Sequence, residues 1–161
     1  MGVWTAGGTS VPGGINDTRL FLAGLRIGRV MTGAHGPGFL RGQMEVVADL
    51  VPVYVVFQGR TVYGAAITPP MFKWNFTSRK KKVVPYVEVG SGLLFSSGDV
   101  PAGTSFFNFT PQVGAGMLVF TREKRAWSLA ARYLHHSNSS LAGRNPGINS
   151  VQFLVGYHWF K

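Results

Sequence analysis

The end of the chain constrains its fold most strongly, because large and small side chains alternate there residue by residue. Between residues 148 and 160, one parity carries large apolar side chains, namely Val151, Phe153, Val155, Tyr157 and Trp159. The other parity carries Gln152, Gly156 and His158. A period of two residues indicates a β-strand, whose successive side chains point to opposite faces. Apolar residues on one face and small or polar ones on the other are typical of a lipid-exposed wall.

Similar alternation recurs along the chain, and helical periodicity is nowhere convincing. Runs rich in Val, Phe, Tyr and Leu, separated by Gly, Pro, Ser and Asn clusters, predict eight strands. Their predicted ranges are 2–9, 18–31, 42–58, 61–76, 82–96, 106–121, 125–137 and 148–160. No linker or repeat divides the sequence, so residues 1–161 are predicted to form a single domain, long enough to close one small barrel.

The connections between these strands differ in kind. Those at 58–60, 78–82 and 122–124 are short and charged, whereas those at 32–41, 97–105 and 138–147 are longer and rich in Gly and Pro. Short turns at one end and long loops at the other are typical of outer-membrane barrels. The predicted fold is therefore all-β, an eight-stranded antiparallel outer-membrane β-barrel.

Composition favours a membrane barrel over a soluble one. Charged residues make up 14% of the chain, against the roughly 25% usual for soluble proteins. A soluble barrel of lipocalin type would need a charged exterior and an apolar interior. The longest apolar stretch, Leu50 to Phe57, contains a proline and is too short for a transmembrane helix. The bacterial outer membrane is the expected location, although the numbering begins without a recognisable export signal.

The charge balance indicates anionic partners. The chain has 16 Lys and Arg against 6 Asp and Glu, a net charge of +10, which favours anionic lipid or phosphorylated glycolipid. Nucleic acid is not expected, because the cations do not form a patch interleaved with aromatics. Residues 79–82 form a basic cluster interpreted as a turn, and Arg41 and Arg144 are predicted to meet lipid phosphates from the loop side. No cysteine is present and the four histidines are scattered, so neither a metal nor a cofactor is predicted.

The stretch RYLHHSNSS, residues 132–140, contains the strongest chemical signal. Strand parity places His135 and Ser137 on the lipid-facing side and His136 on the inner side, where it is expected to form hydrogen bonds. Residues two apart on one strand face have Cβ atoms roughly 6 to 7 Å apart, so the imidazole can reach the hydroxyl. A histidine that takes the proton of a serine is the core of nucleophilic ester hydrolysis. Polar side chains that face hydrocarbon also cost free energy, so their presence there indicates a function.

The stretch HHSNSSLAGRNPGIN resembles the His-x-Ser-Asn and Asn-Pro-Gly pattern of the outer-membrane lipid A 3-O-deacylases of the PagL type. That resemblance is strong over residues 125–160. It implies an eight-stranded barrel with an external active site that removes an ester-linked acyl chain from lipopolysaccharide. It also implies that His135 is the general base, that Ser137 is the nucleophile, and that Asn138 and Asn145 lie at or near the oxyanion site.

The chain departs from this pattern at position 149, where the family carries a glutamate that orients the histidine and this sequence has Asn149. Asn149 shares the outward parity and is expected to orient His135 through its carbonyl. Neither Glu88, on the opposite parity, nor Asp99, in a loop, is an evident replacement. Two hypotheses follow: an outer-membrane esterase acting on lipid A, or a catalytically attenuated or inactive barrel with a structural or partner-binding role. A soluble lipid-binding barrel is a third.

Overall fold

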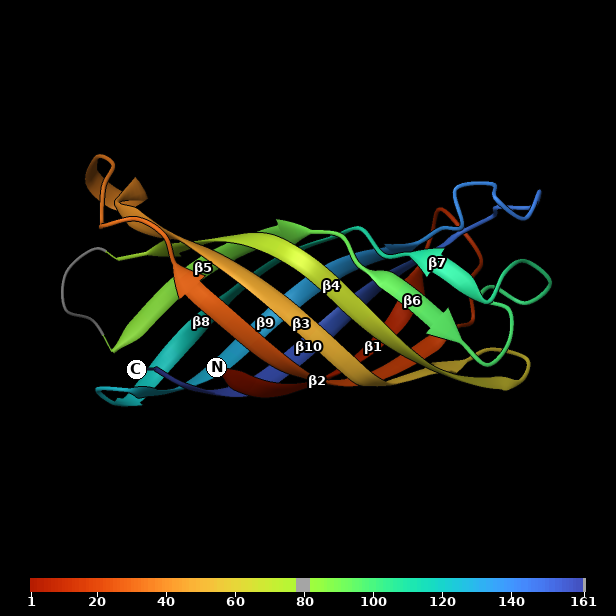
Figure 1. Ribbon diagram of the computed structural model, residues 1–161, viewed down its shortest axis with the longest axis horizontal. Helices are drawn as coiled ribbons and strands as arrows, with labels where there is room; N and C mark the ends of the chain where they lie inside the picture. Colours follow the sequence, from red (N-terminus) through yellow and green to blue (C-terminus); the bar gives the residue numbers. More distant parts are fainter. Residues whose placement is uncertain (78–81, 161) are drawn as a thin grey trace.

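The chain folds into a closed antiparallel β-barrel, shown by a computed structural model that describes residues 1–77 and 82–160. Figure 1 shows the strands running obliquely around one long barrel, with both chain ends at the same end. We call this the terminal end and the opposite one the site end. The part of the chain described contains no helix long and apolar enough to cross a membrane.

Within residues 1–77 and 82–160 the elements are strands, with a single short 3-10 turn. Their bounds are β1 (Gly2–Val11), β2 (Arg19–Val30), η1 (Gly38–Leu40), β3 (Gly42–Phe57), β4 (Thr61–Phe76), β5 (Val83–Gly90), β6 (Leu93–Ser96), β7 (Phe107–Phe109), β8 (Gln112–Arg122), β9 (Arg125–His136) and β10 (Ile148–Trp159). These bounds lie close to the ranges predicted from the sequence.

Two of the eight predicted strands are each interrupted. β5 and β6 both pair with β4 and are separated at Ser91 and Gly92, whereas β7 and β8 are separated at Thr110 and Pro111. Proline has no N–H to donate to a neighbour, which explains the second break. Gly92 and Thr110 still exchange backbone hydrogen bonds of 3.2 and 2.8 Å across the gap. The wall is therefore an eight-stranded barrel, as predicted.

Pairing between the first and last strands closes the wall. β1 pairs with β10 from Gly2 opposite His158 to Val11 opposite Asn149. The same strand pairs with β2 on its other edge. Further round, β3 pairs with β4 to complete the ring. The β1–β2 loop therefore lies beside the loop that joins β9 to β10.

The predicted sorting of connections into a short end and a long end is wrong for two of the connections that the structure describes. Figure 1 shows the short 58–60 turn at the site end, together with the longer 97–105 and 138–147 loops. The long connection before β3 lies at the terminal end, with the 122–124 turn. Strands in an antiparallel barrel alternate in direction, so their order and not loop length decides the end. The predicted turn at 78–82 lies outside the described residues except for Lys82.

The predicted faces are confirmed. Phe153 is 70% exposed, and so are other large apolar residues on the same wall, including Phe21, Leu25, Ile27, Val113, Trp127 and Leu129. The neighbours of Phe153 in sequence, Gln152 and Leu154, are buried. An apolar exterior is the reverse of what a soluble barrel needs. The hypothesis of a soluble lipid-binding barrel is therefore wrong.

A network of buried charges fills the middle of the barrel. Arg26 Nε donates to Asp49 Oδ1 at 2.7 Å, and its Nη1 donates to Glu88 Oε2 at 2.8 Å. Arg132 Nη2 donates to the other oxygen of Glu88 at 3.0 Å. Nearer the terminal end, the Lys73 ammonium lies 3.1 Å from Glu45 Oε2. These pairs satisfy the inward-facing charges, among them Glu88, whose inward parity was expected from the sequence.

Loss of the central carboxylate is expected to weaken the barrel. In Glu88→Gln, Arg26 and Arg132 keep their positive charges but lose a shared buried partner, which is expected to cost about 3 kcal/mol of unfolding free energy. Glu123→Gln, on an exposed turn, is the matched control and is expected to change little. Urea unfolding of the refolded barrel in lipid vesicles measures both. Equal midpoints for the two variants would contradict a stabilising role for Glu88.

Candidate active site

The predicted catalytic residues gather where β9 ends and the 137–147 loop begins. His135 is half-buried on the outer face, and its backbone N–H donates to the Pro111 carbonyl at 2.9 Å. Ser137 lies just past the strand, where its backbone exchanges hydrogen bonds of 2.7 and 3.1 Å with Phe109. The sheet therefore fixes the backbone of both residues.

Asn149 orients the imidazole of His135. The two residues are directly opposite each other on β10 and β9. His135 Nδ1 lies 2.6 Å from Asn149 Oδ1. An amide oxygen only accepts hydrogen bonds, so in the neutral imidazole Nδ1 carries the proton and Nε2 keeps its lone pair. A neutral imidazole with a free Nε2 is the form that a general base requires.

Two glycines enclose this pair. Gly13, on the β1–β2 loop, lies so close that a Cβ there would be 2.7 Å from Asn149 Nδ2. Gly147 has φ 68°, and a Cβ there would be 2.8 Å from His135 Cε1. The two segments are joined by a hydrogen bond of 2.9 Å from the Ile15 N–H to the Gly147 carbonyl. As a result Asn149 is only 8% exposed although it faces outward.

The Ser137 hydroxyl is held by the loop. Asn145 Nδ2 donates to Ser137 Oγ at 2.9 Å, and the Ser139 N–H donates to the same oxygen at 3.1 Å. Within the described residues, Ser137 and His135 do not form a hydrogen bond with each other. The structure thus places the two side chains on one face but in separate contacts.

The two predicted oxyanion asparagines have different contacts. Asn138 is buried, and its side chain donates to the Arg144 carbonyl at 2.9 Å and accepts from the Ser140 N–H at 2.8 Å. Its backbone N–H donates to Asn145 Oδ1 at 3.0 Å. Asn138 therefore shapes the loop, whereas Asn145 contacts both the loop backbone and the hydroxyl of Ser137.

The two acidic residues considered as replacements for the family glutamate lie elsewhere. Glu88 is inside the barrel with Arg26 and Arg132. The backbone carbonyl of Asp99 accepts a hydrogen bond from Gln58 in the 97–105 region. Across residues 1–77 and 82–160, no carboxylate forms an ion pair with His135. His136 faces inward, as predicted, and its Nε2 lies 2.6 Å from the Tyr54 hydroxyl.

The two arginines predicted to share the loop side lie at opposite ends. Arg144 belongs to the site-end loop, but Arg41 follows η1 at the terminal end. Sequence reasoning also missed the β1–β2 loop as part of the site. The glycine pair at 13 and 14 was the signal available in the sequence. It can be interpreted only once the pairing of β1 with β10 shows that this loop lies beside the β9–β10 loop.

Comparison with known proteins agrees with this architecture. The family model described as lipid A 3-O-deacylase (PagL) matches residues 32–158. The chain is similar to lipid A deacylase PagL of Bordetella bronchiseptica, at 28% identity over 162 residues, covering 96% of this chain and 85% of that protein. It also resembles the crystal structure of the outer membrane enzyme PagL, with a TM-score of 0.76 at 21% identity over 97% of this chain and 98% of that one.

The family match extends far beyond residues 125–160, which carried the resemblance in the sequence. It covers the strands from β3 onward, except for the last residue of β10, and the candidate catalytic residues, whereas the β1–β2 loop lies outside it. The remaining strands, β1 and β2, complete the same barrel. The chain therefore belongs to the lipid A 3-O-deacylase (PagL) family of bacterial outer-membrane barrels.

Proposed function

We propose that this protein removes an ester-linked acyl chain from lipid A, with Ser137 as the nucleophile and His135 as the general base. The observation that carries the proposal is the 2.6 Å contact between His135 Nδ1 and Asn149 Oδ1 on the lipid-facing wall. It leaves Nε2 available on the side of the strand that also carries Ser137. Family membership supports the substrate class, since the matching model is named for lipid A deacylation.

The apolar wall below the site suits a lipid substrate. Tyr133, Trp127 and Leu129 are exposed on the same face of β9 as His135, and Phe153 is exposed on neighbouring β10. An acyl chain lying along this wall stays within the hydrocarbon layer, while its ester group lies at the level of the loops. No deep pocket is needed, because the membrane itself presents the chain from the side.

The reaction begins with a rotation of the Ser137 side chain. Its hydroxyl turns from Asn145 towards His135 Nε2, because the two residues share a face but lack a hydrogen bond at rest. Catalytic hydrogen bonds often tighten only when substrate is bound. Nε2 then takes the hydroxyl proton as Oγ attacks the ester carbonyl, and the carbonyl oxygen becomes an oxyanion.

Asn145 is placed to stabilise that oxyanion. Its Nδ2 donates to Ser137 Oγ at rest and becomes free when the hydroxyl rotates. Such a donor is typically worth about 3 to 4 kcal/mol of transition-state stabilisation. Collapse of the intermediate breaks the ester bond, and the sugar oxygen leaves with the proton held on Nε2. Water, activated by the same nitrogen, then hydrolyses the acyl-Ser137 ester and releases a fatty acid.

The second candidate function is an attenuated or inactive barrel with a structural or partner-binding role. Asn149 is the observation that favours it, because an amide can hold the tautomer but supplies no negative charge. A carboxylate also stabilises the imidazolium that forms in the transition state.

Removal of the Ser137 hydroxyl is expected to abolish deacylation without unfolding the barrel. Lipid A is incubated with refolded protein in detergent micelles, and mass spectrometry measures the loss of one acyl chain. Ser91→Ala is the matched control, because Ser91 is an exposed serine outside the site, and it is expected to keep full activity. Equal activity in Ser137→Ala and wild type would remove Ser137 from the mechanism.

A carboxylate at position 149 is expected to raise the turnover rate. Asn149→Asp has the same shape and faces the same nitrogen of His135, so it adds charge without lengthening the side chain. We expect kcat to rise at least about tenfold, since the reverse change in serine proteases lowers kcat about 10⁴-fold. Asn149→Glu, which restores the family residue, is the companion variant.

The same assay separates the two candidate functions. Activity that appears only in the carboxylate variants identifies wild type as an attenuated esterase. A folded wild type and folded carboxylate variants that all leave lipid A intact would contradict the esterase and favour the structural role.

A further inference from the structure

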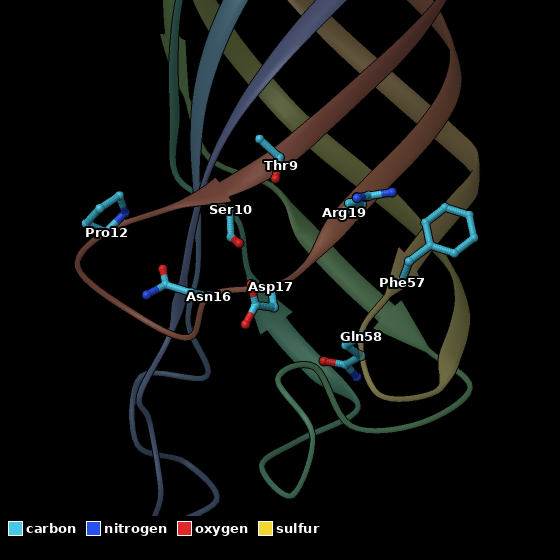
Figure 2. A pocket seen from close by; sticks show the side chains of 8 residues that line it. All are labelled: Thr9, Ser10, Pro12, Asn16, Asp17, Arg19, Phe57 and Gln58. Carbon is cyan, nitrogen blue, oxygen red and sulfur yellow. The ribbon is translucent and has the colours of Figure 1, made fainter.

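A cavity of about 570 Å³ lies at the site end of the barrel, next to the candidate active site but separate from it. Its lining comes from β1, the β1–β2 loop, β2 and the end of β3, and consists of Thr9, Ser10, Pro12, Asn16, Asp17, Arg19, Phe57 and Gln58. Figure 2 shows these side chains around the rim, with Arg19 and Phe57 on neighbouring strands and Asn16 and Asp17 on the loop. None of them belongs to the proposed catalytic group.

The β1–β2 loop connects this cavity to the catalytic residues. Pro12, Asn16 and Asp17 line the cavity, whereas Gly13 lies against Asn149, and Ile15 donates to the Gly147 carbonyl. The cavity and the catalytic residues therefore lie on two sides of one short loop.

The strand register gives the approximate distance between Arg19 and His135. Arg19 is opposite Thr9 on β1, and Thr9 is opposite Val151 on β10, two residues from Asn149. His135 is on β9, the next strand round. Three strand spacings amount to roughly 14 Å along the wall, which is within the breadth of a disaccharide headgroup carrying several acyl chains.

Arg19 is the cation of this cavity, and it forms no ion pair with Asp17, the carboxylate that also lines it. It has the outward parity of Phe21 and Leu25 and is opposite Phe57 across the β2–β3 ladder. Among the residues that the structure describes, no side chain forms a hydrogen bond or ion pair with its guanidinium. The interior arginines Arg26 and Arg132, by contrast, are both paired with carboxylates.

An arginine at the edge of an apolar wall does not by itself indicate a binding site, because anchoring at the membrane interface is enough to explain it. Arg29 is such a residue, because it has the same parity on the same strand at the terminal end. The ten residue steps from one position to the other span roughly 33 Å of strand, which at the usual tilt matches an apolar band about 25 Å high. Arg29 also lines a cavity, at the terminal end, whereas the cavity that Arg19 lines carries hydroxyl and amide groups and lies next to the candidate active site.

We propose that Arg19 and the cavity it lines bind a phosphate group on the saccharide headgroup of the substrate, while an acyl ester of the same molecule reaches Ser137. This inference rests on the proposed function and names the part of the substrate that fixes its position. A guanidinium matches a phosphate with two parallel N–H donors. The exposed amide of Asn16 lies at the same rim to meet sugar hydroxyls.

Substitution of Asp17 tests whether the group bound in this cavity is negatively charged. It is the carboxylate among the lining residues, and it has φ 61°, a conformation that asparagine also accepts. A bound phosphate is repelled by this carboxylate, so Asp17→Asn is expected to strengthen binding, whereas Arg19→Gln weakens it.

The experiment compares deacylation of phosphorylated lipid A with that of chemically dephosphorylated lipid A in mixed micelles. Arg19→Gln is expected to raise KM for the phosphorylated substrate about tenfold, the loss of one charged hydrogen-bonding group. It should leave kcat near wild type and leave the dephosphorylated substrate unaffected. Arg29→Gln is the matched control, with the same change of charge on the same strand face, and is expected to leave both substrates unaffected.

Three results of this kinetic comparison would overturn the proposal. They are an equal loss on both substrates, an equal effect of the Arg19 and Arg29 substitutions, and a higher KM in Asp17→Asn. Phosphatidylglycerol added as a competitor separates a headgroup-specific site from general attraction to lipid phosphate. Competition as strong as that of unlabelled lipid A would identify Arg19 as an interface anchor only.

A binding measurement without turnover tests the phosphate subsite independently of the proposed esterase activity. Affinity for the two lipid A forms is measured in Ser137→Ala, with and without Arg19→Gln. A phosphate-dependent affinity that Arg19→Gln removes supports the subsite even if wild type leaves lipid A intact. Equal affinities for the two forms overturn the subsite even if the esterase is active.

Discussion

Closure of the hydrogen-bonded wall is the constraint on which the rest of this structure depends. Hydrocarbon offers no partner to a backbone N–H or C=O, so a sheet in a membrane must have no open edge. Pairing of β1 with β10 removes the last edge here. It also decides the composition of the site, because the β1–β2 loop is brought beside the β9–β10 loop. Gly13 reaches Asn149 for this reason, although the two are far apart in sequence.

A closed barrel whose strands alternate with a period of two residues also places its paired charges and its candidate site residues on opposite faces. Inward positions collect the paired charges around Glu88. Outward positions meet lipid, and His135 and Asn149 are polar residues among them. Their cost in that setting is reduced by the glycines that cover them and by their mutual hydrogen bond. The same alternation that makes the outer wall apolar therefore places the imidazole of His135 on the face that meets lipid.

Strand parity was sufficient to predict most of the fold and the outward direction of His135 and Asn149. The inward and outward positions on β9 and β10 follow from the two-residue period of a strand. The burial or exposure of a neighbouring residue does not change that period. Loop length was a poor guide to the ends of the barrel, because direction alternates with strand order. The breaks at Gly92 and Pro111 were also missed, since a run of suitable residues hides a local loss of pairing.

The contacts of the site were harder to foresee, because they depend on loops that fold back. The distance of two residues between His135 and Ser137 suggested a direct pair, yet the Ser137 hydroxyl is engaged by Asn145 and the Ser139 backbone. Seven residues of loop lie between Ser137 and Asn145, and no periodicity relates them. The role of Gly13 was equally hidden, since it requires knowing which strands are neighbours.

Register explains why an asparagine can occupy the place of the longer family residue. Asn149 is directly opposite His135 in the ladder, where Cβ atoms of facing residues are about 5 Å apart. A side chain of one methylene and an amide spans that gap, as the 2.6 Å contact shows. The amide oxygen orients the ring and, being neutral, avoids burying a charge in a position that is 8% exposed. Orientation and charge, which a carboxylate supplies together, are thus separable at this position, and the chain retains the first.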